Sequence, residues 1–293
     1  MTNDIDPRLT TVRLTGTGVQ LDAMVGGPDD GPLVLLLHGF PDAWWTWRGQ
    51  IGPLLSAGYR VVVPTMRGYG GSDKPVGLDA YRLDVLAEDV LAIVDDLGYE
   101  TFRLVGHDWG GVVAWETAIR APARVERLVV LDAPHPDVMR QVVRNNPSQI
   151  LRSWYVLLFQ LPRLPEAILR RHTFAALRRS LSSSSAPGTF SDDDLARLVA
   201  SWAKPGALTA MLAYYRALRR KPWRDPARVT SRTLVVWGGR DRFLSRAAFD
   251  ASLAMCDDGA GLWVEEASHW VHLEQPERVV DAILRCFRET NAS

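Results

Sequence analysis

The feature that most constrains the fold is a glycine-flanked turn, Gly106-His107-Asp108-Trp109-Gly110, which follows the apolar run Phe102–Val105. Glycines two positions before and two positions after a central residue let the chain bend tightly, because they carry no Cβ atom. A bend of this kind joins a strand to a helix and holds the central side chain clear of the backbone. The pattern predicts such an elbow at this point, with Asp108 at its tip.

The chemical character of the elbow is set by its central carboxylate. Aspartate has an ordinary pKa of about 3.9, so at neutral pH it is already an anion and needs no base to become a nucleophile. Such a group suits displacement at an electrophilic sp³ carbon, which would leave an alkyl ester on the protein. The simpler alternative is that Asp108 only caps the following helix.

The runs of apolar residues indicate the fold class. Short, nearly continuous apolar stretches are typical of parallel strands that are covered on both faces; here they span residues 33–38, 59–64, 102–106, 125–131 and 233–237. Helical spacing separates them at 83–98, 112–120, 246–255 and 276–287, residues 262–265 form a further strand candidate, and residues 10–14 and 19–25 resemble an N-terminal hairpin. Alternation of strands and helices predicts a doubly wound α/β sheet.

Residues 135–225 differ from the rest of the chain. They contain no comparable strand run, and helical patterns are interrupted by several prolines. We expect a helical cap here, inserted between a first core segment, residues 1–134, and a second, residues 226–293. Within the cap, Ser182–Ser185 suggests a polar hinge or surface loop, and Asp192–Asp194 suggests the start of a helix.

Composition limits the classes of function. The 34 basic and 34 acidic residues balance, so no global field favours nucleic acid or an anionic membrane. Cys256 and Cys286 have neither zinc-like nor redox spacing, so we expect no metal, and nothing implies a cofactor. The N-terminus lacks the features of a signal peptide and no apolar stretch could span a bilayer, which predicts a cytoplasmic protein without a membrane span.

Several separate motifs identify a family resemblance. The chain resembles the α/β-hydrolases, most closely their epoxide hydrolases and next the haloalkane dehalogenases, over nearly its whole length. The motifs are the elbow at 106–111 together with His38-Gly-Phe-Pro41, Arg67-Gly-Tyr-Gly-Gly-Ser72 and Asp132-Ala-Pro-His-Pro136. The resemblance implies an α/β-hydrolase fold with a mostly parallel eight-stranded sheet, and an oxyanion hole made by the backbone amides of Phe40 and Trp109.

An ester on Asp108 would need a base to activate water, and histidine does this best near neutral pH. The resemblance places that base at His269, after the last predicted strand, whereas His272 is expected to pack or cap locally. A carboxylate on the other ring nitrogen would fix the tautomer. Asp241 holds the family's usual position for this acid, and Asp132 holds the position that some dehalogenases use.

The leaving group distinguishes the two closest branches. An epoxide oxygen leaves as an alkoxide that needs a proton, which a phenol with a pKa near 10 can supply. Segments 153–162 and 211–216 resemble those that carry two such tyrosines in epoxide hydrolases, and they supply Tyr155 and Tyr215. Trp109 and Trp154 keep haloalkane dehalogenase as the alternative, because two indoles could hold a halide.

The sequence therefore predicts conversion of a small hydrophobic epoxide and water to a vicinal diol. Phe40, Trp109 and Trp154 are the expected substrate contacts, and the protein is expected to be a monomer or homodimer that binds no nucleic acid. Trp44, Trp45 and Trp47 are expected in the core. The arginines at 163, 170, 171, 178 and 179 are interpreted as a solvated helix face.

Overall fold

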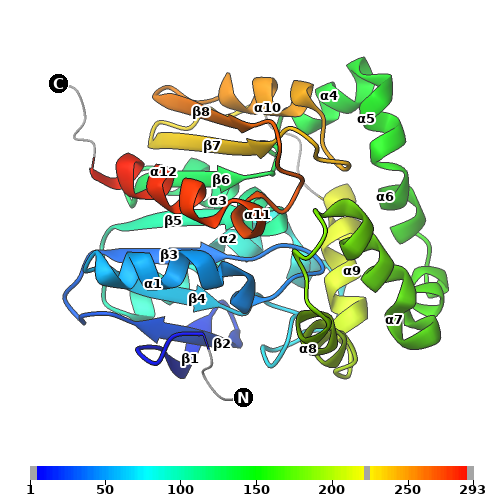
Figure 1. The fold of residues 1–293 in the computed structure, drawn as a ribbon, viewed down its shortest axis with the longest axis horizontal. Coiled ribbons are helices and arrows are strands. Elements are labelled where there is room, and N and C mark those ends of the chain that lie inside the picture. Colours follow the sequence, from blue (N-terminus) through cyan, green and yellow to red (C-terminus); the bar gives the residue numbers. More distant parts are fainter. Residues whose placement is uncertain (1–4, 221–224, 289–293) are drawn as a thin grey trace.

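The computed structural model describes residues 5–220 and 225–288. Its centre is a single eight-stranded sheet with the strand order β1-β2-β4-β3-β5-β6-β7-β8, drawn in Figure 1. The strands are β1 Thr10–Gly16, β2 Val19–Gly26, β3 Leu33–Leu37, β4 Arg60–Pro64, β5 Phe102–His107, β6 Val125–Leu131, β7 Arg232–Gly238 and β8 Gly259–Val264. β1 pairs antiparallel with β2 and β2 with β4, while every other pairing is parallel. The predicted α/β class and N-terminal hairpin are confirmed.

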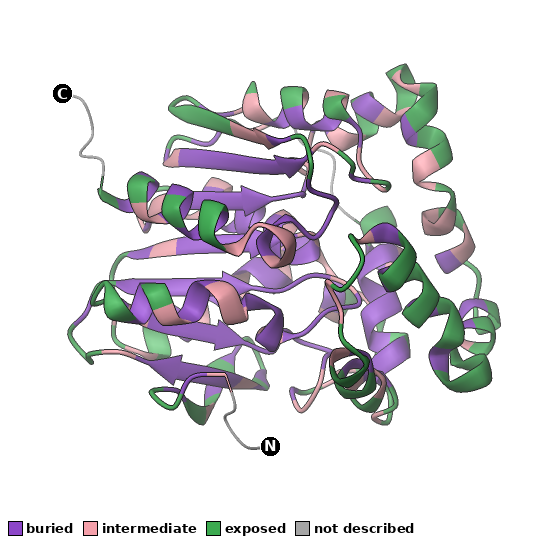
Figure 2. Cartoon of the chain, viewed as in Figure 1, coloured by how far each residue is buried: buried purple, intermediate pink, exposed green. Residues whose placement is uncertain are grey.

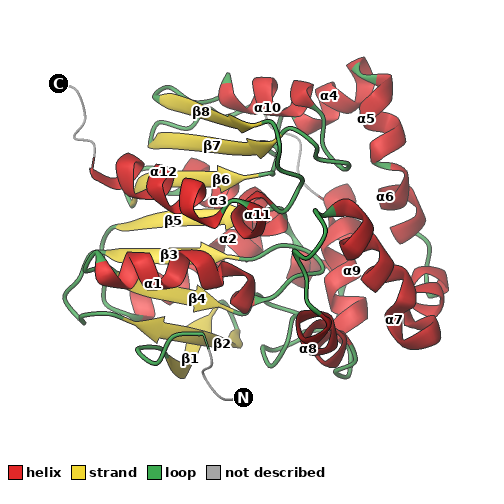
Figure 3. Cartoon of the chain, viewed as in Figure 1, coloured by secondary structure: helices red, strands yellow, loops and turns green. Residues whose placement is uncertain are grey.

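Helices cover both faces of the sheet, as the apolar strands require. All five residues of β3 are buried, and because successive side chains of a strand point to opposite faces, they enter two separate cores. Leu35 and Leu37 join the core under α2 (Leu83–Asp96), α3 (Trp109–Arg120) and α10 (Arg246–Leu253). Val34 and Leu36 join the core under α1 (Arg48–Ser56), α11 (Val271–Glu274) and α12 (Pro276–Arg288). Figure 3 shows the resulting three layers.

The segment between β6 and β7 consists, in its described part, mainly of helices joined by loops. It contains α4 Met139–Asn145, α5 Pro147–Arg152, α6 Trp154–Phe159, α7 Leu164–Ser184, α8 Asp192–Trp202 and α9 Ala207–Ala217, followed by a 3₁₀ turn at Leu218–Arg220. We call residues 139–220 the insert. Figure 1 shows it beyond the carboxyl ends of the parallel strands, the edge at which the elbow opens. The exact division into core and cap remains a prediction, and residues 221–224 lie outside the described residues.

The structure differs locally from the sequence predictions. The hinge predicted at Ser182–Ser185 is wrong for its first three residues, because α7 continues to Ser184 and buries Leu181 and Ser184. α7 is itself bent, with non-helical angles from Arg171 to Phe174. β8 begins at Gly259, three residues before the predicted strand. The helix predicted at Asp192–Asp194 is confirmed as α8, where Ser191 forms a capping box with Asp194.

Burial follows the layers, with the sheet enclosed and much of the insert open to solvent (Figure 2). Among the described residues, no helix combines the length and apolar character needed to cross a membrane.

Candidate active site

Asp108 lies in the tight turn that the sequence predicts. β5 ends at His107 and α3 starts at Trp109, while Asp108 between them has φ 49° and ψ −121°. A positive φ strains a residue that has a Cβ atom, and such strain is concentrated at functional sites. A Cβ atom at position 106 would lie 2.3 Å from the Gly110 carbonyl oxygen, so this position of the turn requires glycine.

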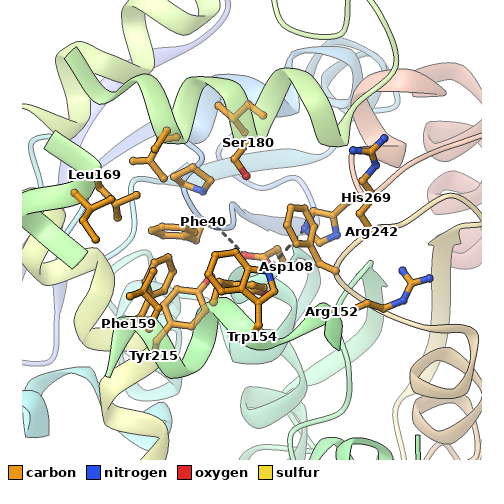
Figure 4. A pocket seen from close by; sticks show the side chains of 18 of the residues that line it. Phe40, Asp108, Arg152, Trp154, Phe159, Leu169, Ser180, Tyr215, Arg242 and His269 are labelled. Carbon is orange, nitrogen blue, oxygen red and sulfur yellow. Dashed lines mark hydrogen bonds and ion pairs between the residues drawn. The ribbon is translucent and has the colours of Figure 1, made fainter. Parts of the chain in front are cut away.

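The Asp108 carboxylate is held by one backbone donor and faces one imidazole. The Phe40 amide donates to Oδ1 at 2.8 Å, and Oδ2 lies 3.5 Å from Nε2 of His269; Figure 4 shows both interactions at the floor of the cavity. Burial tends to raise the pKa of Asp108, but the hydrogen bond and charge of His269 outweigh it and lower that pKa. Asp108 is therefore an anion, and 19% of its side chain is exposed.

His269 is oriented by Asp241. Nδ1 of His269 lies 2.8 Å from Oδ2 of Asp241, so a proton on Nδ1 leaves Nε2 directed at Asp108. The other oxygen of Asp241 accepts the backbone amides of Phe243 and Leu244 at 2.7 and 3.0 Å. Burial lowers the pKa of His269, but the negative charge of Asp241 and the contacts with Asp108 outweigh it and raise that pKa well above its usual value.

Asp132 is close to this pair but has a different environment. Its Oδ1 accepts the Gly238 amide at 2.8 Å, while Oδ2 has no partner among the described residues. Burial and the nearby charge of Asp241 raise the pKa of Asp132 well above its usual value. Nδ1 of His269 therefore donates to Asp241, while burial and the charge of Asp241 favour the neutral form of the Asp132 carboxyl beside this pair.

Within residues 5–220 and 225–288, two buried clusters each bring three potential metal ligands within 4.8 Å of one another. One consists of Asp132, Asp241 and His269, and the other of Asp42, His107 and His272. In the first cluster, Oδ2 of Asp241 already accepts a hydrogen bond from Nδ1 of His269 at 2.8 Å. Independence from metals and cofactors remains a prediction.

Both predicted tyrosines line the same cavity as Asp108 and His269. The rings of Tyr155 and Tyr215 meet edge to face with centroids 6.0 Å apart. Burial raises the pKa of both phenols. For Tyr155 the next cause is the charge of Asp108, and for Tyr215 it is the nearby Tyr155. Both phenols therefore retain their protons at neutral pH. The neighbouring Tyr214 instead donates to the Arg67 carbonyl at 2.7 Å and is buried in the core.

The cavity has a volume of about 710 Å³. Phe40 and Trp154 line it, as expected of substrate contacts, whereas Trp109 is not among its lining residues. The Trp109 ring packs behind Tyr215, with centroids 5.0 Å apart. A direct contact between Trp109 and substrate therefore stays a prediction, and its visible role is to support Tyr215.

The remaining aromatic predictions concern the core. Trp45 and Trp47 are buried, which confirms the core prediction for them, and Trp44 is partly buried against both cores. His272 is fully buried and packs on Trp47, as expected of a structural residue.

His38 and His107 are also fully buried. Burial lowers the pKa of His38 to about 4 and that of His107 to about 3, which favours the neutral imidazole in both. Nε2 of His107 lies 2.9 Å from the His269 carbonyl oxygen, so His107 donates to the backbone of His269 and supports it.

Several cavity residues are not indicated by the sequence, among them two aromatic residues that pack on the predicted site. Phe243 packs on both His269 and Tyr155, with centroids 5.0 and 5.8 Å away. Phe159 packs on Tyr215 at 5.0 Å and on Phe40 at 5.8 Å. The position of Phe243 two residues after Asp241 was the available signal, because a turn after a strand brings such neighbours to one edge. Phe159 had no comparable signal.

Comparison with known proteins agrees with this geometry. Residues 32–276 match the model of the alpha/beta hydrolase fold family. The AB hydrolase superfamily protein YfhM of Bacillus subtilis is 43% identical over 91% of this chain and 94% of its own length. Epoxide hydrolase 4 of Mus musculus is 35% identical over 96% of this chain and 80% of its own. A crystal structure of Bacillus megaterium epoxide hydrolase with an inhibitor superposes with a TM-score of 0.86 at 30% identity, covering 95% of this chain and all of that one.

Proposed function

The chain belongs to the α/β-hydrolase fold family, in its epoxide hydrolase branch, and from that membership we propose how it hydrolyses an epoxide to a vicinal diol. The observation that carries the proposal is one cavity that contains an ionised Asp108, a buried imidazole and two protonated phenols. Haloalkane dehalogenation, the alternative, is not favoured, since the matched relatives named above include epoxide hydrolases and no dehalogenase.

In the first step, Asp108 forms a bond to one epoxide carbon. Phe40 already holds Oδ1, so Oδ2 is the oxygen that attacks and Oδ1 becomes the carbonyl oxygen of the ester. The bond between that carbon and the ring oxygen breaks as the new bond forms. Tyr155 and Tyr215 hold the ring oxygen from the insert side, and one phenol transfers its proton to it. The product of this step is a hydroxyalkyl ester.

In the second step, His269 removes a proton from water and the hydroxide adds to the ester carbonyl carbon of Asp108. The charge that develops on Oδ1 is stabilised by the Phe40 amide, already 2.8 Å away. The Trp109 amide is the second proposed donor, because the first residues of a helix have N–H groups without partners inside the helix. This intermediate collapses as the bond between its carbonyl carbon and the substrate oxygen breaks, and the departing alkoxide takes the proton from His269 to give the diol. The remaining proton on the Asp108 carboxyl returns to the phenolate, which restores both the carboxylate and the phenol.

The charges of the site favour this order of events. In the free enzyme, the negative charge of Asp241, together with that of Asp108, raises the pKa of His269 well above its usual value. Ester formation removes the charge of Asp108, so the pKa of His269 falls. The neutral imidazole, the form that accepts a proton from water, is therefore more favoured once the ester is present.

A substrate panel tests the activity. Aromatic and aliphatic epoxides of similar size are compared with 1-chloroalkanes and 1-bromoalkanes of matched length, with diol and halide release as readouts. Diol formation without halide release is expected. Halide release without epoxide turnover would assign the protein to the dehalogenase alternative.

A further inference from the structure

The outer face of the insert exposes an unusual concentration of large apolar side chains. Of the nine that are exposed among the described residues, seven lie between Ile150 and Ile168. We call these seven the insert patch: Ile150, Leu151, Trp154, Leu157, Leu161, Leu164 and Ile168. Leu151, Leu157 and Trp154 are 75%, 72% and 63% exposed. Single exposed apolar residues are ordinary, but a contiguous set marks an interaction surface.

The patch runs along consecutive segments of the insert. Ile150 and Leu151 lie in α5, Trp154 and Leu157 in α6, Leu161 after α6, and Leu164 and Ile168 in the first turns of α7. Their neighbours Tyr155, Leu158 and Phe159 are less exposed and line the catalytic cavity. Figure 2 shows that α5 and α7 present mostly exposed residues at the outer edge of the molecule, whereas α6 between them is largely intermediate.

The charge of the insert is strongly unbalanced although that of the chain is not. Residues 139–220 contain twelve arginines and one lysine but only four acids, a net charge of +9 in a chain whose formal charge is zero. Five exposed arginines belong to α7 or its cap, directly after the patch: Arg163, Arg170, Arg171, Arg178 and Arg179. The balanced total therefore conceals a basic insert on an acidic core.

The patch also borders the opening of the cavity. Leu151, Trp154 and Ile168 are at once exposed members of the patch and lining residues of the catalytic cavity. A surface that binds the insert patch would therefore lie beside the opening of the cavity.

We propose that the insert patch docks on an anionic lipid surface, with the apolar side chains entering the headgroup region and the α7 arginines contacting lipid phosphates. Exposed leucine and tryptophan side chains next to arginines are typical of segments that bind a membrane interface. Each arginine near an anionic membrane surface increases the affinity about fivefold. A second copy of this chain is a poorer occupant, because pairing two patches would bring two inserts of net +9 together.

Docking would deliver apolar substrates directly from the lipid phase. This consequence depends on the proposed hydrolysis of a hydrophobic epoxide, whereas docking itself does not. Vesicle binding is therefore measured without substrate, so that the two proposals can fail separately.

The experiment measures co-sedimentation with vesicles of phosphatidylcholine alone and of phosphatidylcholine mixed equally with phosphatidylglycerol. Wild-type protein is expected to bind the mixed vesicles, more weakly as salt rises. Leu157→Gln with Leu164→Gln, neither of which lines the cavity, should weaken binding at least about tenfold. Arg170→Gln with Arg171→Gln should weaken it about 25-fold.

The matched controls change the same residue types elsewhere. Val76→Gln replaces a fully exposed apolar residue outside the patch, and Arg285→Gln with Arg288→Gln removes two exposed arginines of α12, at the opposite side of the molecule in Figure 1. Both should bind as wild type does, and thermal unfolding should show that every variant is folded.

Two results would overturn the proposal. One is that wild-type protein does not sediment with the mixed vesicles at low salt, or that both patch variants bind them as strongly as wild-type protein does. The other is a lipid-free homodimer, seen by sedimentation velocity, that Leu157→Gln with Leu164→Gln dissociates, since the patch would then be covered by a second copy.

Discussion

Oδ2 of Asp108 and Nε2 of His269 face each other across 3.5 Å, although Asp108 follows β5 and His269 follows β8. The separation leaves His269 beside the carbonyl that a water must attack once Asp108 carries an ester. The same contact links their protonation, because the anion raises the pKa of the imidazole and the imidazole lowers that of the anion.

The base can be tested by trapping the ester. His269→Gln keeps a polar side chain of similar size but cannot accept the proton from water, so ester should form and persist. Intact-protein mass spectrometry after mixing with an epoxide should show an increase equal to one substrate. His272→Gln serves as a control for a nearby buried histidine, and turnover without accumulation in His269→Gln would remove His269 from this role.

The two tyrosines should share the protonation of the ring oxygen. Tyr155→Phe and Tyr215→Phe should each slow ester formation about 10- to 100-fold, and the double variant about 10³-fold or more, because general acids contribute in this range. Stopped-flow single turnovers measure the rate.

Tyr214→Phe is the matched control for the tyrosine variants. It removes the hydrogen bond to the Arg67 carbonyl and should cost about 1 kcal/mol of stability with little change in rate. A larger rate loss in Tyr214→Phe than in Tyr215→Phe would reverse the assignment.

The choice of acid can be tested with paired amides. Asp241→Asn should lower kcat about 10²- to 10⁴-fold, because the amide cannot stabilise the imidazolium or fix its tautomer equally well. Asp132→Asn keeps an oxygen acceptor for the Gly238 amide and should retain most activity. Comparable losses in the two variants would show that both carboxyls serve His269.

Stability should depend on pH through Asp132. The pKa of Asp132 is higher in the folded protein than in the unfolded chain, where it is about 3.9. Asp132 therefore stabilises the fold fully below a pH of about 3.9, and this stabilisation is lost as pH rises through its folded pKa. An amide at this position does not titrate, so the stability advantage of Asp132→Asn over wild type should grow from pH 4 toward neutral pH. Urea unfolding across this range measures it, and a constant difference would show that Asp132 is ionised in the fold.

The sheet and its elbow could be predicted because their signals are local. Continuous apolar runs predicted β3 to β7, and the glycines around Asp108 predicted the turn. The structure shows why glycine is needed: a Cβ atom at Gly106 would lie 2.3 Å from the Gly110 carbonyl oxygen. α1 was missed because Gly49, Gly52 and Pro53 hide its apolar spacing, and the start of β8 was missed because Gly259 and Gly261 contribute no apolar side chains.

The site was harder to predict where neighbours come from distant segments. That Asp241 contacts His269 while Asp132 does not depends on how the loops after β6 and β7 turn, which neither sequence position specifies. The same limit applies to Trp109, whose indole packs behind Tyr215 instead of lining the cavity. The exposure of Leu151 and Leu157 was also hidden, because helical spacing alone does not tell a buried face from an open one.

The central claim, a temporary bond between Asp108 and the substrate, is tested most directly by one turnover in ¹⁸O-labelled water with enzyme in excess. Water adds to the carbonyl carbon of Asp108, so the first diol should carry unlabelled oxygen taken from the carboxylate, and the label should be found on Asp108 in the peptide that contains it. Label in the diol of the first turnover, with Asp108 unlabelled, would mean that water attacks the epoxide directly and would contradict the account.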